Sequence, residues 1–289
     1  MKYGIYYAYW EKQWGGDFRP YVERVKKLGF DILEISCATL LQTSDKELDE
    51  LKALSARHGV TLTSGYGPTL ENCVSAADPA AVDKALDFYD RMFQVLQRLG
   101  IRFAGGGLYS YWPVDYSLPI DKPADWERAV DGVRRMADIA AKYDVTLGME
   151  VLNRFEGYLL NTCAEAVDFV DQVDCKNVKI MLDTFHMNIE EDSFGAAIRR
   201  AGDRLGHLHL GECNRKVPGQ GRMPWREIGE ALRDIGYDGA VVMEPFVLQG
   251  GQVGGDIKVW RNLNDGSDAT LDRDAANAVA FTRYMFEGQ

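Results

Sequence analysis

The sequence predicts an α/β fold of the (β/α)8 barrel class, in which eight parallel strands alternate with helices. Short apolar, β-branched or aromatic runs alternate with longer amphipathic segments from Lys2 to about Gly288, a rhythm typical of repeated β–α units. Eight such runs fit a chain of 289 residues, because barrels of this class typically contain about 250 residues. The spacing leaves no gap for a second domain, so we expect a single barrel domain over residues 1–289.

The expected strands are short and bounded by polar or glycine-containing segments. They are YGIYYAY from Tyr3, ILEIS from Ile32, VTLTSG from Val60, IRFAGG from Ile101, VTLGMEV from Val145, VKIMLD from Val178, LGHLHL from Leu205 and GAVVME from Gly239. An open doubly wound sheet is the alternative, but no GxGxxG follows the first strand. The regular alternation therefore favours the barrel.

The segments between these strands have helical spacing. Apolar residues form two stripes of this kind, namely Phe18, Val22, Val25 and Leu28, and Ala85, Phe88, Met92, Val95 and Leu99. Glycine then follows three of the expected helices, at Gly29, Gly100 and Gly236. Because helices commonly end at glycine, these positions predict three helix ends just before the next strand.

Composition excludes several classes of partner. The formal net charge of −11 and the lack of a basic run argue against nucleic acid. The five cysteines have no CxxC spacing and are odd in number, which argues against a disulfide framework and a thiolate metal site. The sequence also has neither a leader pattern nor a run of 18 apolar residues. We therefore expect a cytoplasmic protein with reduced thiols that does not bind a membrane.

Two connections are longer than usual for this fold, at residues 106–125 and 210–224. Each follows an expected strand, so each is expected at the carboxyl end of the barrel. Enzymes with this fold have their active sites at that end.

Four consecutive late strands end in a side chain that can bind a metal. These are Glu150 in GMEVLN, Asp183 in IMLDTFH, His209 in HLHLGE and Glu244 in VMEPF. One terminal carboxylate could equally form a salt bridge across the barrel mouth, but four ligand-type ends in succession favour a metal site. Three carboxylates and one imidazole suit Mn²⁺, Mg²⁺ or Co²⁺.

The stretch GHLHLGE places His207 and His209 on the same face of a strand. Strands rise about 3.3 Å per residue, so His207 is expected roughly 6 to 7 Å deeper in the barrel. Only His209 then lies level with the three carboxylates. We expect His209 to be a ligand and His207 to be a packing residue.

Long motifs make the chain resemble the ketose 3-epimerases, the D-tagatose and D-psicose (D-allulose) 3-epimerase family of xylose-isomerase-like TIM barrels. They are EVLNRFE (150–156), VKIMLDTFHMNIEED (178–192), GECNRKVPG (211–219), GRMPW (221–225), MEPF (243–246) and SYWPVDY (110–116), with GIYYAYWE near the start and DIKVWR at 256–261. The resemblance implies a divalent metal, Mn²⁺ above Co²⁺ or Mg²⁺, on the residues matching Glu150, Asp183, His209 and Glu244. It also implies a free ketohexose or ketopentose as substrate, and a homodimer or homotetramer.

The resemblance further implies a reaction that inverts C3 of a ketose, as between D-fructose and D-allulose or between D-tagatose and D-sorbose. The C3 proton lies next to the C2 carbonyl, so its removal gives a cis-enediolate that a metal on O2 and O3 stabilises. Inversion needs a base on each face of C3, the roles implied for Glu150 and Glu244. Contacts to the sugar are implied for His186 at O2, and for Glu156 and Arg215 at the O1 end.

Aromatic residues at or beyond strand ends are expected to line the sugar-binding site and exclude water from it. They are Tyr6, Trp14, Trp112 and Phe246. Three residues depart from the family pattern: Leu210 in place of threonine, Gly107 in place of alanine, and Tyr66 at a variable pocket position. These departures bear on the contacts to the far end of the sugar.

The same residues also allow other interpretations. Arg215 and Glu156 are equally consistent with an exposed ion pair, and His186 with a cap on the next helix. Aldose–ketose isomerisation on the same barrel and a non-catalytic sugar-binding barrel are alternative functions. A phosphodiesterase of the endonuclease IV type is disfavoured, because its metal cluster needs more histidines than the four in this chain.

Overall fold

Eight parallel strands close into a barrel in chain order, with β8 pairing back onto β1. The computed structural model describes residues 1–288. The strands are β1 (Lys2–Tyr6), β2 (Ile32–Ser36), β3 (Thr61–Gly65), β4 (Phe103–Gly106), β5 (Thr146–Glu150), β6 (Val178–Asp183), β7 (Leu205–Leu210) and β8 (Ala240–Met243). All eight predicted strands are present, so the barrel is confirmed over the open doubly wound sheet.

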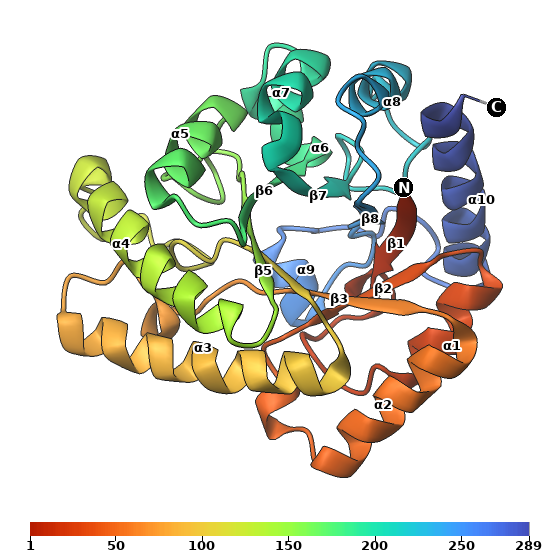
Figure 1. The fold of residues 1–289 in the computed structure, drawn as a ribbon. Coiled ribbons are helices and arrows are strands. Elements are labelled where there is room, and N and C mark those ends of the chain that lie inside the picture. Colours follow the sequence, from red (N-terminus) through yellow and green to blue (C-terminus); the bar gives the residue numbers. More distant parts are fainter. Residues whose placement is uncertain (289) are drawn as a thin grey trace.

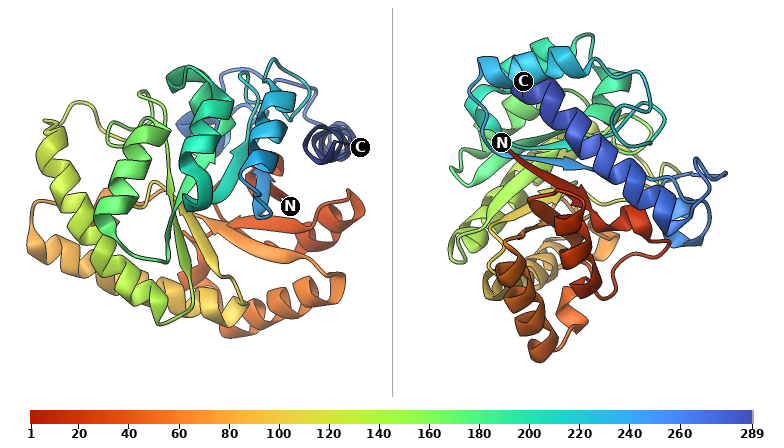
Figure 2. Two further views of the ribbon diagram at one scale, coloured as in Figure 1. Left: turned by 45° about the horizontal axis from the view of Figure 1, so that its top comes forward. Right: turned by 90° about the vertical axis from the view of Figure 1, so that its right-hand side faces the viewer.

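Helices form a ring outside the strands, and the N-terminal strand β1 begins on the same side of the barrel as the last helix, α10 (Figure 1 and Figure 2). The α-helices are α1 (Arg19–Lys27), α2 (Asp45–His58), α3 (Pro79–Leu99), α4 (Lys122–Ala141), α5 (Cys163–Val173), α6 (Thr184–Glu190), α7 (Phe194–Ala201), α8 (Trp225–Asp234), α9 (Gly251–Asp256) and α10 (Asp268–Glu287). Short 3-10 helices lie at Tyr7–Trp10, Leu40–Gln42, Leu70–Asn72 and Gly202–Arg204.

Local sequence signals explain where α3 begins and ends. The Asp78 side chain accepts a hydrogen bond from the Ala80 amide, and Pro79 occupies the first turn. Gly100 ends the helix in the left-handed conformation, with φ of 77°. Ala85 and Met92 of the predicted apolar stripe are buried. Gly29 and Gly236 also have positive φ just past α1 and α8, which confirms the other two helix ends.

The barrel interior below the carboxyl end is filled by large side chains that need small neighbours. A Cβ on Gly148 would lie 2.4 Å from the Phe103 ring, and one on Gly105 would lie 2.4 Å from the Met181 sulfur. The Phe103 ring in turn stacks on His207, with centroids 4.4 Å apart and an interplanar angle of 11°. His207 thus lies buried among interior side chains, where the sequence placed it.

The chain after β8 differs from a regular barrel. The short helix α9 interrupts a long connection between Glu244 and Ser267, and the sequence did not predict it. Glycine lowers helix propensity in its GQVGGD sequence, but Val253 of this helix is buried and Asp256 accepts a hydrogen bond from Trp14. Among residues 1–288, every helix is too short or too polar to cross a bilayer. The five cysteines are free thiols.

Candidate active site

Four side chains from β5 to β8 converge at the carboxyl end of the barrel. Glu150 and Asp183 are the last residues of β5 and β6, His209 lies near the end of β7, and Glu244 directly follows β8. One oxygen or nitrogen from each lies within 4.8 Å of the others. His209 Nδ1 is 3.6 Å from Glu244 Oε2, 3.7 Å from Glu150 Oε1 and 4.0 Å from Asp183 Oδ2. Ligands about 2.1 Å from one cation lie roughly 3 to 4.2 Å apart, so the spacing fits a shared ion.

The hydrogen bonding of these groups also fits a cation. Asp183 Oδ2 and His209 Nδ1 are buried and have no hydrogen-bond partner among residues 1–288. The other ends of the same groups are engaged, because Asp183 Oδ1 accepts from the Phe185 amide at 2.6 Å and His209 Nε2 lies 2.5 Å from Glu34 Oε1. Buried polar atoms rarely remain unpaired, so the two free atoms mark a place for a ligand.

Charge at the cluster favours the same conclusion. Burial, and then the nearby Glu244 carboxylate, raises the pKa of Glu150 well above its ordinary range. Two carboxylates in one buried space repel each other unless a positive charge lies between them. The donor set, which is three carboxylates and one imidazole, therefore suits a hard divalent cation such as Mn²⁺, Co²⁺ or Mg²⁺.

His186 faces the cluster from α6. Its Nδ1 accepts a hydrogen bond from the Asn153 backbone N–H at 3.2 Å. The proton of the neutral ring is therefore on Nε2, which lies 3.9 Å from Asp183 Oδ2 and 4.0 Å from Glu150 Oε1. The capping alternative is wrong, because Ser193 caps the next helix, α7. His186 thus presents an N–H donor beside the carboxylates.

Arg215 and Glu156 form a pair inside the cavity rather than on the surface. Arg215 is 6% exposed, and its Nη2 lies 2.8 Å from Glu156 Oε1. Its guanidinium packs 3.5 Å from the centre of the Phe185 ring. Burial raises the pKa of Glu156, but the Arg215 charge and the hydrogen bonds from Asn153 and Arg215 outweigh that effect and lower the pKa below its ordinary value. The exposed ion pair considered from the sequence is therefore wrong.

Two nitrogens of Arg215 remain available. Nε and Nη1 are buried without a hydrogen-bond partner among the described residues, and Nη1 is 3.8 Å from Glu244 Oε2. The backbone of Arg215 has a φ of 61°, a conformation that non-glycine residues rarely adopt. Such unpaired donors in a cavity are suited to bind oxygen atoms of a ligand.

Glu212 organises the loop that carries Arg215, and sequence reasoning missed it. Its fully buried carboxylate accepts hydrogen bonds from the Gly219 amide at 2.7 Å, the Met223 amide at 3.1 Å and Trp225 Nε1 at 2.8 Å. These bonds tie the beginning of the loop after β7 to its end. The signal in the sequence was an acidic residue followed by a glycine- and proline-rich segment, which does not reveal where the carboxylate points.

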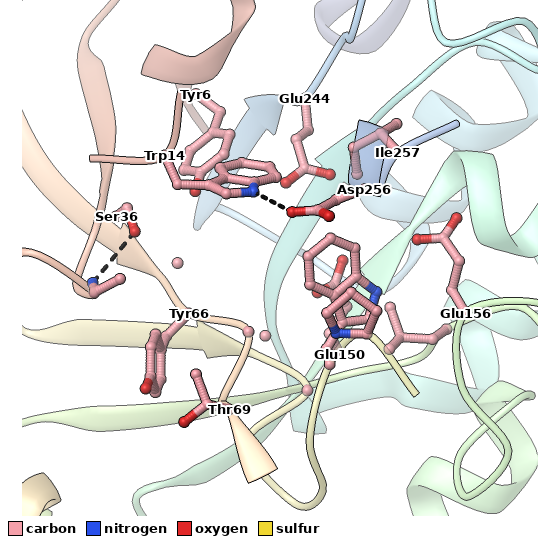
Figure 3. Close-up of a pocket in the computed structure, with 18 of the residues that line it drawn as sticks. Tyr6, Trp14, Ser36, Tyr66, Thr69, Glu150, Glu156, Glu244, Asp256 and Ile257 are labelled. Carbon is pink, nitrogen blue, oxygen red and sulfur yellow. Dashed lines mark hydrogen bonds between the residues drawn. The ribbon is translucent and has the colours of Figure 1, made fainter. Parts of the chain in front are cut away.

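A cavity of about 480 Å³ opens above the cluster. Its lining includes predicted residues of three kinds: the aromatics Tyr6, Trp14, Trp112 and Phe246, the polar residues Glu156, His186 and Arg215, and the cluster members Glu150, His209 and Glu244. Figure 3 shows Trp14 near Tyr6 and Glu244, with its Nε1 donating to Asp256 Oδ2 at 2.7 Å. Asp256 belongs to α9, so the unpredicted helix supplies one wall.

The three positions that depart from the family pattern have different surroundings. Tyr66 and Gly107 line the cavity. Tyr66 stacks on Phe88 and accepts a hydrogen bond from Asn72 at 2.9 Å. Leu210 is fully buried and is absent from the cavity lining, because alternation along β7 puts it on the face opposite His209. Leu210 therefore does not contribute to the contact surface for a ligand.

The chain is similar to known proteins over most of its length. The model of the family described as "xylose isomerase-like TIM barrel" matches residues 22–263. A D-psicose 3-epimerase from Ruminiclostridium cellulolyticum is 58% identical over 288 residues, covering 99% of this chain and 98% of the relative. A D-psicose 3-epimerase from Agrobacterium fabrum is 53% identical over 289 residues, and the alignment covers 100% of this chain and 100% of the relative.

A solved structure agrees along the whole chain. The crystal structure of a D-psicose 3-epimerase with D-tagatose, from Clostridium cellulolyticum H10, has a TM-score of 0.98 and 57% sequence identity, and 99% of each chain is covered. This chain therefore belongs to the xylose isomerase-like TIM barrel family and, within it, to the ketose 3-epimerases.

Proposed function

We propose that this protein catalyses the metal-dependent epimerisation of free ketoses at C3, with D-fructose/D-allulose and D-tagatose/D-sorbose as candidate pairs. The observation that carries the proposal is the convergence of Glu150 and Glu244, from the nonadjacent strands β5 and β8, on one cluster under the cavity. A sugar-binding protein has no need for two carboxylates at one carbon. Full-length relatives named D-psicose 3-epimerase, at 53% to 58% identity, support the same reaction.

In the proposed mechanism the two glutamates act on opposite faces of C3. One carboxylate removes the C3 proton, and the other returns a proton from the other side, which inverts the configuration. The N–H of His186 donates to O2, where negative charge develops in the cis-enediolate. A divalent cation on Glu150, Asp183, His209 and Glu244, for which we propose Mn²⁺ before Co²⁺ or Mg²⁺, would supply Lewis-acid stabilisation of that charge.

The remaining cavity residues are assigned to binding and orientation. The free Nε and Nη1 of Arg215, held beside Glu156, suit the hydroxyl oxygen at the O1 end of the sugar. Tyr6, Trp14, Trp112 and Phe246 provide apolar walls that exclude water from C3. Exclusion of water protects the reactive cis-enediolate from side reactions and keeps the electrostatic contacts strong.

Deuterium incorporation distinguishes the proposed reaction from the alternatives. We expect the protein with Mn²⁺ and D-fructose or D-allulose in D₂O to incorporate deuterium at C3, because the carboxylate that returns a proton takes up deuterium from the solvent between turnovers. The measurement is proton NMR or mass spectrometry of the recovered sugars. Label at C1 alone would establish an aldose–ketose isomerase, and sugars recovered without label at any carbon would contradict the proposed epimerisation.

We also propose a homodimer or homotetramer, acting in the cytoplasm. Phe155 is 71% exposed, and the neighbouring loop presents Tyr116, Leu118 and Ile120, each 45% to 47% exposed. Tyr116 Oη donates to the Arg154 carbonyl at 3.0 Å, so this loop lies beside Phe155. Such a group of exposed apolar side chains is typical of an interaction surface.

Light scattering coupled to size exclusion tests this assembly. We expect the protein to have two or four times the mass of one chain and Phe155→Glu to have the mass of a single chain, because the charge would be desolvated in the interface. Tyr284→Glu is the matched control, since Tyr284 is 58% exposed on α10, far from the loop in sequence, and should leave the assembly intact. A monomeric unmodified protein would contradict the proposal.

A further inference from the structure

We propose that Glu34 is a positioning residue for the metal centre, fixing the tautomer and orientation of His209. Glu34 lies in β2, 175 residues from His209 in the sequence, and its side chain is fully buried in the barrel. This inference rests on the proposed metal-dependent function, but it concerns a residue outside the four ligands. It assigns a role to a buried carboxylate that the proposed mechanism does not otherwise use.

Both oxygens of Glu34 are engaged. Oε1 lies 2.5 Å from His209 Nε2, and Oε2 accepts a hydrogen bond from Thr63 Oγ1 at 2.7 Å. His207 Nε2 is 3.1 Å from Oε2, but it is not aligned for a hydrogen bond. Thr63 therefore orients Oε2 of the carboxylate, and the His207 ring packs against the same oxygen and restricts the Glu34 side chain.

This arrangement dictates which nitrogen of His209 faces the ligands. An ionised carboxylate only accepts hydrogen bonds, so His209 must carry its proton on Nε2. The neutral ring then has its lone pair on Nδ1. That atom lies 3.6 to 4.0 Å from Glu244, Glu150 and Asp183 and has no hydrogen-bond partner among residues 1–288. Glu34 thus stabilises the tautomer that can bind a cation.

An alternative is that Glu34, His207 and His209 themselves hold a cation, because their polar atoms also lie within 4.8 Å of one another. The 2.5 Å separation of Glu34 Oε1 and His209 Nε2 argues against it. Two ligands of one cation are separated by roughly 3 Å or more when each is about 2.1 Å from the ion. The short separation is that of a charge-assisted hydrogen bond.

Loss of such a supporting carboxylate typically weakens metal binding by about 10- to 100-fold. We therefore expect Glu34→Met to bind Mn²⁺ about 10- to 100-fold more weakly than the unmodified protein. Glu34→Gln should lose less affinity, because its amide oxygen can still accept the proton of His209 Nε2. Binding is measured by titration calorimetry on chelator-treated protein, so the readout does not depend on turnover.

Glu212→Gln is the matched control. Glu212 is also fully buried and accepts three hydrogen bonds, but none comes from a proposed ligand. Its Mn²⁺ affinity should change by much less than the roughly tenfold expected for loss of a supporting carboxylate, because Glu212 contacts none of the four proposed ligands. Equal Mn²⁺ affinity in Glu34→Met and the unmodified protein would overturn the inference. An unmodified protein that binds no Mn²⁺ would instead contradict the proposed function.

The tautomer is measured independently of any variant. The chain has four histidines, so long-range ¹H–¹⁵N spectra of histidine-labelled protein, saturated with diamagnetic Mg²⁺, resolve each ring. We expect His209 to carry its proton on Nε2 and to have an unprotonated Nδ1. A proton on Nδ1, or two Mn²⁺ ions per chain in the calorimetric titration, would overturn the inference even if Glu34→Met fails to fold.

Discussion

Glu150→Gln and Glu244→Gln are each expected to lower turnover by about 10³-fold or more while the barrel remains folded. General acid–base groups contribute about 10²- to 10⁴-fold each, and each glutamate is also a proposed ligand of the cation. A glutamine can neither take up nor return the C3 proton. The measurement is kcat for D-fructose or D-allulose at saturating Mn²⁺, together with circular dichroism to verify the fold.

The stability of these variants separates a catalytic role from a structural one. Burial and the nearby Glu244 raise the pKa of Glu150, so the ionised form is disfavoured in the metal-free protein. A neutral amide at position 150 removes the repulsion between this carboxylate and Glu244. The melting temperature of metal-free Glu150→Gln should therefore be no lower than that of the metal-free unmodified protein. Glu127→Gln, on the exposed side of α4, is the control and should keep full activity. Full activity in Glu150→Gln or Glu244→Gln would refute the two-base mechanism.

Removal of the metal is expected to reduce activity to background, and addition of Mn²⁺ should restore it. Two buried atoms of the cluster, Asp183 Oδ2 and His209 Nδ1, have no partner within residues 1–288, and they should be left unsatisfied when the cation is removed. An ion that binds only the folded state stabilises it by about 2.7 kcal/mol at a hundredfold excess over its Kd. Chelator-treated protein should therefore also unfold at a lower temperature.

Asp183→Asn makes this test specific to the cluster. The asparagine side-chain oxygen can still accept from the Phe185 amide, as Asp183 Oδ1 does at 2.6 Å, so the start of α6 is preserved. The charged ligand is lost, however, and Mn²⁺ should neither restore activity nor raise the melting temperature at concentrations that saturate the unmodified protein. Turnover by protein that elemental analysis finds free of metal would rule out the Lewis-acid role.

The fold and the cluster could be predicted because their signals are local. Each strand is a short apolar run, and the end of a strand in a parallel barrel is also the edge where active sites lie. Glu150, Asp183, His209 and Glu244 lie at or next to the ends of four successive strands, and this pattern predicts that they meet. The same reasoning separated His209 from His207 by depth along one strand.

Other features depend on contacts that the sequence does not display. Glu34 reaches His209 across the barrel, from β2 to β7, and its only sequence signal is a charged residue inside the apolar run ILEIS. Glu212 lies in a loop whose path is set by its own hydrogen bonds. The helix α9 forms in a glycine-rich segment, where propensity predicts irregular chain.

The contact between Glu34 and His209 has a consequence for how the protein acquires its activity. It joins residues that are 175 positions apart, so both β2 and β7 must be in place before the His209 ring is fixed. The barrel itself closes through the pairing of β8 with β1, the last and the first strands in the chain. Mn²⁺ affinity therefore depends on the relative placement of β2 and β7, and a variant that shifts these strands apart should bind the ion more weakly, as expected for Glu34→Met.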